Sequence, residues 1–150
     1  MTDVLFYHLQ RQPLEAVLPA LVEKSLARGW RVAIEVPDAE RLAALDDHLW
    51  LYRDDSFLPH GTDRSPDCAG EPVLLVCTRD NVNGADVRFL VDGAGLPDDA
   101  QSYARIVLMF DGNDDAALAR ARDEWRKVRA LGLAATYWQQ DDTGRWIRKG

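Results

Sequence analysis

The chain has little of several things that would indicate a familiar chemistry. It contains only two cysteines, Cys68 and Cys77, so neither a disulfide framework nor a paired zinc-ligand motif is indicated. Basic residues are outnumbered, 18 against 25 acidic ones, and the formal charge of −7 disfavours non-specific nucleic-acid binding by the whole surface. No run approaches the roughly 18 apolar residues of a membrane span. These absences predict a cytoplasmic protein that is neither exported nor inserted in a membrane.

Glycine-rich phosphate loops are also missing. The first apolar run leads through Tyr7 and His8 into Gln10 without a glycine, and no G-x-x-x-x-G-K-[ST] motif occurs. Gly93 and Gly95 are followed by a leucine, a proline and an aspartate, which cannot supply the third glycine of a dinucleotide fingerprint. We therefore expect no nucleotide cofactor and no small-molecule substrate.

Catalytic and metal-binding motifs are absent in the same way. There is no G-x-S-x-G elbow, and no motif links His8, His48 or His60 to a nucleophile, so structural or solvated roles are favoured for all three. A cluster of His60 with the two cysteines matches no recurring ligand spacing, and an apolar strand position suits a buried thiol. The sequence predicts no catalytic residue, no cofactor and no metal.

What is present is the pattern of a single α/β domain over residues 1–150, of which 47% are hydrophobic. A strand at 4–7 is followed by a helix from Leu14, in which Pro19 either opens the main helix after a separate first turn or kinks it. A strand up to residue 36 and a helix over 39–49, capped by Asp38, come next. Alternation of this kind predicts a Rossmann-like fold, a mainly parallel sheet flanked by helices and lacking a nucleotide-binding glycine loop.

The second half continues the pattern after a long loop over residues 54–72, which contains three prolines and two glycines. Strands are expected at 73–77, 87–91, 105–110 and 134–139, and a helix at 114–131 begins with Asp114 as its cap and ends before Gly132. From about residue 141 the chain is expected to be a polar tail.

The last helix carries the one informative constellation, a local inversion of charge in an acidic chain. Between residues 118 and 129, five basic residues accompany only two acidic ones. The apolar face expected to pack on the sheet consists of Leu118, Ala121, Trp125, Val128 and Leu131, and a basic stripe at i, i+3, i+4 and i+7 consists of Arg122, Trp125, Arg126 and Arg129. A half-buried ring between guanidinium groups suits an acidic peptide that ends in a hydrophobic residue. The competing interpretation is an exposed helix face solvated by charge pairs.

Aromatic residues also gather at residues 49–52, where Trp50 and Tyr52 alternate with two leucines at a helix end. Grouped aromatics of this kind mark partner surfaces when they are exposed, and core packing is the other explanation.

Taken in order along the chain, several segments resemble the chi subunit family of the bacterial DNA polymerase III holoenzyme. The segments that carry the resemblance are Phe6-Tyr7, Leu26-Ala27-Arg28-Gly29-Trp30-Arg31-Val32, Leu45-Asp46-Asp47-His48-Leu49-Trp50, Ser56-Phe57-Leu58-Pro59-His60, Asn83-Gly84-Ala85-Asp86-Val87, and Trp125-Arg126 to Tyr137-Trp138-Gln139-Gln140. None is diagnostic alone, but their order and spacing together are.

The resemblance implies a non-catalytic adaptor of the replisome on a Rossmann-like fold without nucleotide chemistry. Chi proteins bind the acidic, phenylalanine-terminated tail of single-stranded DNA-binding protein and, in many bacteria, the psi subunit of the clamp loader, so that contact with DNA is indirect. Carried over by position, the tail site falls on Trp50, Arg122, Trp125 and Arg126. The psi-facing surface falls near Phe57 and Leu58.

The chain departs from the family pattern in two ways. Better-known members carry tyrosine and lysine at the positions of Trp125 and Arg126, and a further lysine at the position of Leu118, so ring and cation are kept while one charge is lost. The extension beyond Trp138 is also longer, and Trp146, Arg145 or Arg148 either replaces that charge or is unrelated to it. Two other functions stay open on the residues alone: a degenerate nucleotide-binding α/β enzyme, and direct contact of the arginine face with single-stranded DNA.

Overall fold

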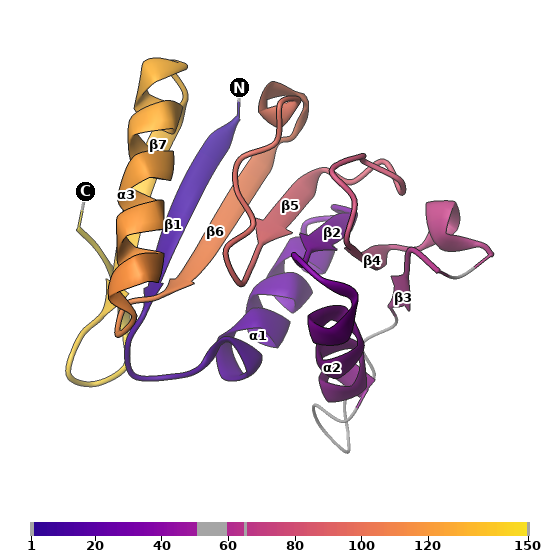
Figure 1. The fold of residues 1–150 in the computed structure, drawn as a ribbon, viewed down its shortest axis with the longest axis horizontal. Helices are drawn as coiled ribbons and strands as arrows, with labels where there is room; N and C mark the ends of the chain where they lie inside the picture. Colours follow the sequence, from indigo (N-terminus) through magenta and orange to yellow (C-terminus); the bar gives the residue numbers. More distant parts are fainter. Residues whose placement is uncertain (1, 51–59, 65, 150) are drawn as a thin grey trace.

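The computed structural model describes residues 2–50, 60–64 and 66–149, with the side chain of Trp50 excepted. Eight strands form one sheet in the order β3-β4-β2-β5-β6-β1-β7-β8, and every pairing is parallel except that of β7 with β8 (Figure 1). The strands are β1 (Asp3–Leu9), β2 (Val32–Glu35), β3 (Gly61–Thr62), β4 (Val73–Val76), β5 (Val87–Leu90), β6 (Arg105–Asp111), β7 (Ala134–Gln140) and β8 (Trp146–Arg148). The helices are α1 (Leu14–Ala27), α2 (Ala39–Trp50) and α3 (Asp115–Ala130), with short 3-10 turns at Cys68–Gly70 and Ala100–Ser102. The expected α/β fold with a mainly parallel sheet is confirmed.

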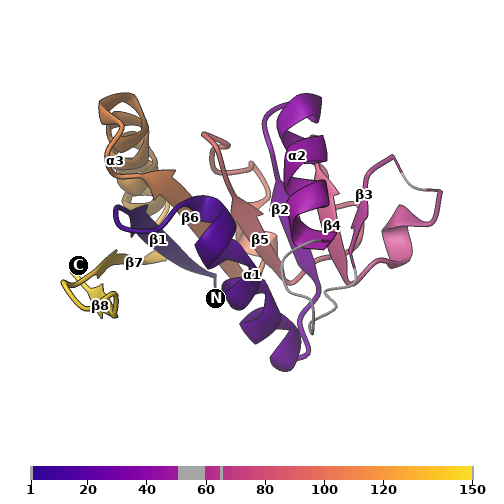
Figure 2. The same ribbon diagram turned by 90° about the horizontal axis from the view of Figure 1, so that it is seen from below.

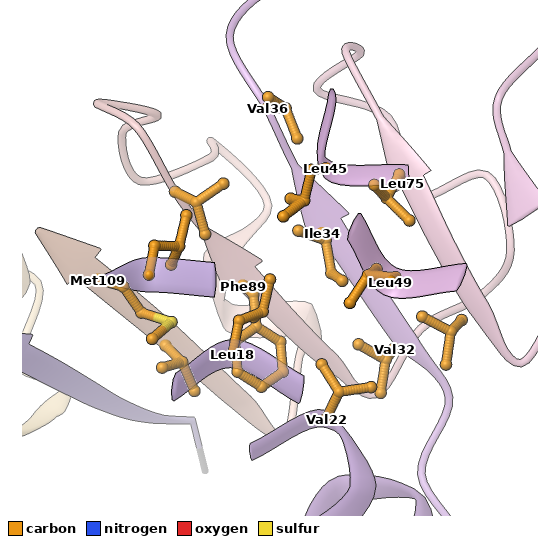
Figure 3. Close-up of a cluster of buried hydrophobic side chains, with 14 of the residues drawn as sticks. Leu18, Val22, Val32, Ile34, Val36, Leu45, Leu49, Leu75, Phe89 and Met109 are labelled. Carbon is orange, nitrogen blue, oxygen red and sulfur yellow. The ribbon is translucent and has the colours of Figure 1, made fainter. Parts of the chain in front are cut away.

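The helices cover opposite faces of the sheet, because the chain crosses over in opposite directions from the neighbouring strands β1 and β6. Helices α1 and α2 pack on one face together with Ile34, Phe89 and Met109 (Figure 3). Helix α3 packs through Ala121 and Val128 on the other face. Figure 2 shows α1 and α3 on the two sides of β1 and β6.

Helix α1 runs from Leu14 to Ala27 with Pro19 inside it, so no separate first turn exists. A proline has no N–H for the carbonyl four residues earlier, which here belongs to Glu15. The imidazole Nε2 of His48, on α2, lies 2.9 Å from that carbonyl oxygen and takes the place of the missing donor. The contact between the two helices therefore compensates for the proline, and His48 has the structural role expected for it.

The other helix ends follow the expected capping chemistry. The Asp38 carboxylate accepts a hydrogen bond of 2.7 Å from the backbone N–H of Arg41, and the Asp114 carboxylate accepts one of 2.9 Å from the N–H of Ala116. Gly29 and Gly132, which follow α1 and α3, have φ angles of +80° and +74°, which only glycine adopts without strain.

Four expectations need correction. Cys77, expected as a buried thiol in an apolar strand, follows β4 and is exposed. The loop at 54–72 contains strand β3, which pairs with β4 at one edge of the sheet. The polar tail forms β8, an antiparallel partner of β7, because Gly144 adopts a φ of +84° and turns the chain back. Leu131, placed on the packing face of the last helix, is 50% exposed because it is the cap residue at which that helix ends.

The sheet face opposite α1 and α2 contains a buried ion pair beneath the loops. Arg88 is fully buried and donates hydrogen bonds of 3.0 and 2.7 Å to Glu35 Oε1, while the exposed Arg79 donates to Oε2 of the same carboxylate. The Tyr103 hydroxyl lies 3.2 Å from Arg88 Nη1. These contacts satisfy two charges that would otherwise be costly to bury.

Candidate functional site

Helix α3 and the three strands beneath it enclose a pocket of about 460 Å³. Its wall on the helix side contains Arg122, Trp125 and Arg126, so the structure brings together three of the four residues expected at the tail site. The rest of its lining is made of Leu118 and Ala121 on the same helix, His8 on β1, Phe110 on β6 and Tyr137 on β7. We call this site the α3 pocket.

Trp125 is the ring around which the α3 pocket is built. It packs edge-on against Phe6 of β1 at a centroid distance of 5.2 Å and against Tyr137 of β7 at 6.1 Å. Phe6 is fully buried, whereas Trp125 is only partly buried, so one part of the indole belongs to the core and the other faces the pocket. The expectation of a half-buried ring on α3 is confirmed.

The two arginines that flank Trp125 are in different states. Among the residues that the structure describes, Arg122 has no carboxylate within ion-pair distance. Burial raises the pKa of Tyr137, and the nearby Arg122 partly offsets this increase. Arg126 pairs with Asp123 at 3.0 Å, but its side chain is 74% exposed, and an exposed pair of this kind contributes little. Both guanidinium groups are therefore accessible to an anionic ligand.

Three residues of the α3 pocket were not predicted from the sequence: His8, Phe110 and Tyr137. The rings of Phe110 and Tyr137 lie 6.0 Å apart, and His8 packs against both, at 5.2 Å from Phe110 and 5.9 Å from Tyr137. His8 Nδ1 and the Tyr137 hydroxyl share a hydrogen bond of 2.5 Å. Together these rings provide an apolar wall with one polar pair in it.

The position of these three residues follows from the order of the strands. Strand β1 lies between β6 and β7, and His8 is opposite Phe110 while Phe6 is opposite Tyr137. Side chains two apart on a strand share one face. The only signal in the sequence was the aromatic content of the two strands, because their register is set by contacts far apart in the chain.

Trp50 is described in its backbone only. It is the last residue of α2, which packs with α1 on the face opposite α3. The two helices thus lie on opposite faces of the sheet, and the expectation that Trp50 and Trp125 line one recess stays a prediction. Phe57 and Leu58, expected to face psi, lie outside the described residues.

Trp146 lies in the C-terminal extension, which the sequence offers as a replacement for the lost lysine charge. The structure packs it edge-on against Tyr7 at 4.9 Å, with the core that lies beneath α1. Trp146 thus points to the opposite face of the sheet from the α3 pocket. It packs against the edge of that core and does not line the α3 pocket.

A second cavity, of about 760 Å³, lies at the carboxyl ends of β1 and β6, where ligands bind in many parallel α/β folds. The loop after β1 that lines it, residues 10–13, contains no glycine. Five of its charged side chains are paired with one another: Arg41 with Glu15 and Asp92, and Lys127 with Glu124. The arrangement is that of a salt-bridged surface rather than a phosphate cradle.

The described residues contain no group of three potential metal ligands and no helix that is long and apolar enough to cross a membrane. His60 is buried and bonded through Nε2 to the Asp46 carboxylate at 2.8 Å, so in the described part of the chain its role is structural.

Fold and site together define a class: an α/β protein whose aromatic and cationic pocket is formed by a helix face over the sheet rather than by loops at the strand ends. A family model described as DNA polymerase III chi subunit, HolC, matches residues 1–136. The chain belongs to this family of DNA polymerase III accessory subunits, which act in DNA replication.

Two curated relatives agree with this assignment. A protein of Pseudomonas aeruginosa named DNA polymerase III subunit chi is 27% identical over 137 residues, which cover 88% of this chain and 92% of the relative. A protein of Rickettsia prowazekii named probable DNA polymerase III subunit chi is 25% identical over 117 residues, which cover 74% of this chain and 71% of the relative.

Proposed function

We propose that this chi-family chain is a non-catalytic adaptor that binds the acidic, phenylalanine-terminated tail of single-stranded DNA-binding protein in the cytoplasm. The observation that supports the proposal most is the α3 pocket, where accessible guanidinium groups border an aromatic recess in a chain of formal charge −7. Anionic and apolar groups are thus recognised side by side, which is the chemistry of such a tail.

The binding mode follows from the two sides of the pocket. The last aromatic side chain of the tail enters the recess beside Trp125, and its carboxylates pair with Arg122 and Arg126. Arg122 binds without breaking an ion pair to any described residue, whereas Arg126 exchanges its exposed pair with Asp123 for the ligand. A short peptide that must be ordered is expected to bind with a dissociation constant in the micromolar range, about −8 kcal/mol, that weakens with salt.

The test is titration of an acidic peptide ending in phenylalanine against paired arginine variants on one helix. Arg122→Ala is expected to raise the dissociation constant about tenfold, because a charge-assisted hydrogen bond is lost. Arg120→Ala removes the same charge from a residue that lines the other cavity, and it should leave binding within about twofold. Equal effects of the two substitutions, with both proteins folded, would contradict the site.

Two rival functions have separate assays. Titration with labelled single-stranded DNA in the absence of any other protein should give no binding at 150 mM salt, since the net charge of −7 opposes it. Calorimetry with common nucleotides and magnesium should give no binding heat. A saturable signal in either experiment would favour that rival over the adaptor.

We also propose that the chain links this tail to the clamp loader through psi where that subunit exists. The proposal rests on family membership and on the segment at Phe57 and Leu58. Co-purification from the native host tests it: Phe57→Ser with Leu58→Ser should lose psi but keep tail binding, because neither residue belongs to the tail site proposed on α3. Retention of psi by the double variant would exclude this segment as the interface.

A further inference from the structure

The apolar wall of the α3 pocket contains a polar pair that the proposed mode of binding does not yet use. His8 comes from β1 and Tyr137 from β7, and the two are diagonal neighbours, since Phe6 is the residue opposite Tyr137. Both side chains line the pocket, and His8 Nδ1 and the Tyr137 hydroxyl are 2.5 Å apart. This hydrogen bond is therefore within reach of a ligand that enters the pocket beside Trp125.

The imidazole of His8 is held in one orientation by its neighbours. Its ring packs edge-on against Phe110 at 5.2 Å. On the other side it occupies the space that a side chain at residue 112 would need, because a Cβ built on Gly112 falls 1.9 Å from His8 Nε2. The pairing of Nδ1 with Tyr137 therefore depends on a glycine after β6.

The charged and titratable groups around this pair come from three elements. Strand β7 contributes the Tyr137 hydroxyl, strand β6 ends in Asp111, and helix α3 contributes Arg122 and Arg126. Burial raises the pKa of Tyr137, partly offset by Arg122, so the phenol stays protonated near neutral pH and can donate a hydrogen bond.

We propose that His8 and Tyr137 form a donor relay for the free terminal carboxylate of the peptide, in addition to Arg122. The His8 Nδ1–H donates to the Tyr137 oxygen, and the Tyr137 hydroxyl donates to the carboxylate. Tyr137 is then a ligand-binding residue and His8 is the positioning residue that orients it. This inference rests on the proposed function and adds a specificity element to it: the pocket distinguishes a chain terminus from an internal acidic residue.

The relay makes binding sensitive to pH. Burial lowers the pKa of His8 below its ordinary value of 6.5, against the raising effect of Asp111. A carboxylate bound to the relay stabilises the imidazolium, so the pKa of His8 is higher in the complex than in the free protein. Binding then takes up a proton, and affinity increases as the pH falls from 8 towards 5.5, a range in which the peptide carboxylates remain ionised.

Titrations of the phenylalanine-terminated peptide at pH 8.0 and 5.5 test the relay. The wild-type dissociation constant should fall about fivefold at the lower pH. His8→Asn places an amide N–H near the position of Nδ1 without a titrating group, so it should bind as the wild type does at pH 8.0 and show no pH dependence. Tyr137→Phe should weaken binding about tenfold at both pH values. Tyr7→Phe removes a hydroxyl from the other face of β1 and serves as the matched control.

Two further measurements separate a ligand role from a structural one. Wild-type binding heats in phosphate and Bis-Tris buffers at pH 6 should differ by the proton taken up, and this difference should vanish with His8→Asn. A peptide with an amidated C-terminus should bind weakly to all four proteins. Wild-type behaviour of both His8→Asn and Tyr137→Phe at both pH values would overturn the relay while leaving the proposed function intact. Failure of the wild type to bind the peptide at all would overturn both.

Discussion

The indole of Trp125 packs edge-on against the fully buried ring of Phe6, with centroids 5.2 Å apart. This contact fixes α3 on strand β1 and at the same time holds the exposed part of the indole at the α3 pocket. Substitution of Trp125 is therefore expected to change both stability and peptide binding, whereas substitution of Arg126 is expected to change binding alone.

Trp125→Ala is expected to lower the free energy of unfolding by about 2 kcal/mol, because a partly buried ring is lost from the core. Arg126→Ala should change it by less than about 0.5 kcal/mol, since its pair with Asp123 is exposed. Both should weaken peptide binding. Urea denaturation and peptide titration of the same samples measure the two effects, and a destabilised Arg126→Ala would contradict the assignment of that side chain to the surface.

Gly112→Ala is expected to weaken peptide binding several-fold, because the added Cβ occupies the place of the His8 ring and displaces it from Tyr137. Gly70 is the matched control, since a Cβ there meets nothing within 4 Å. The measurement is titration of both variants after thermal melts. If Gly112→Ala binds as well as Gly70→Ala, the His8 ring is not held as described.

Glu35→Gln is expected to cost about 3 kcal/mol of stability, because it leaves the buried guanidinium of Arg88 without its counter-charge. Arg79→Ala removes the half-exposed partner of the same carboxylate and should cost less than about 1 kcal/mol. Denaturant midpoints compare the two. A similar, small cost for both would show that the Arg88 pair is not desolvated.

His48→Ala is expected to destabilise the chain by about 1–2 kcal/mol. Pro19 has no N–H for the carbonyl of Glu15, so the substitution removes the donor that replaces it. Pro19→Ala restores the helical N–H, so the loss should be smaller in the double variant than in His48→Ala alone. A double-mutant cycle in urea measures this coupling, and strict additivity would contradict the compensating role of His48.

The sequence predicted what depends on short-range chemistry. The helices α2 and α3 were located by their hydrophobic periodicity and by the residues at their ends, Asp38, Asp114 and Gly132. The spacing of Arg122, Trp125 and Arg126 indicated that the three share one face of α3. These features depend on neighbours within a few residues, so they can be identified before the fold is known.

What the sequence did not predict depends on contacts between distant segments. His8 and Tyr137 are 129 residues apart, and they meet because β1 inserts between β6 and β7. The packing of α2 and α3 on opposite faces of the sheet follows from the directions of the crossovers. Strand β8 was hidden by its polar composition, since its pairing requires the turn at Gly144.

The central claim is that an acidic, phenylalanine-terminated peptide occupies the α3 pocket. Of the five tryptophans, Trp125 alone lines that pocket among the described side chains. We predict that peptide titration monitored by two-dimensional NMR shifts the Trp125 indole N–H and the backbone amides around His8 and Tyr137, and that these shifts are lost with Arg122→Ala. Shifts confined to the loops after β1 and β6, at the larger cavity, with the Trp125 indole unmoved, would contradict the claim.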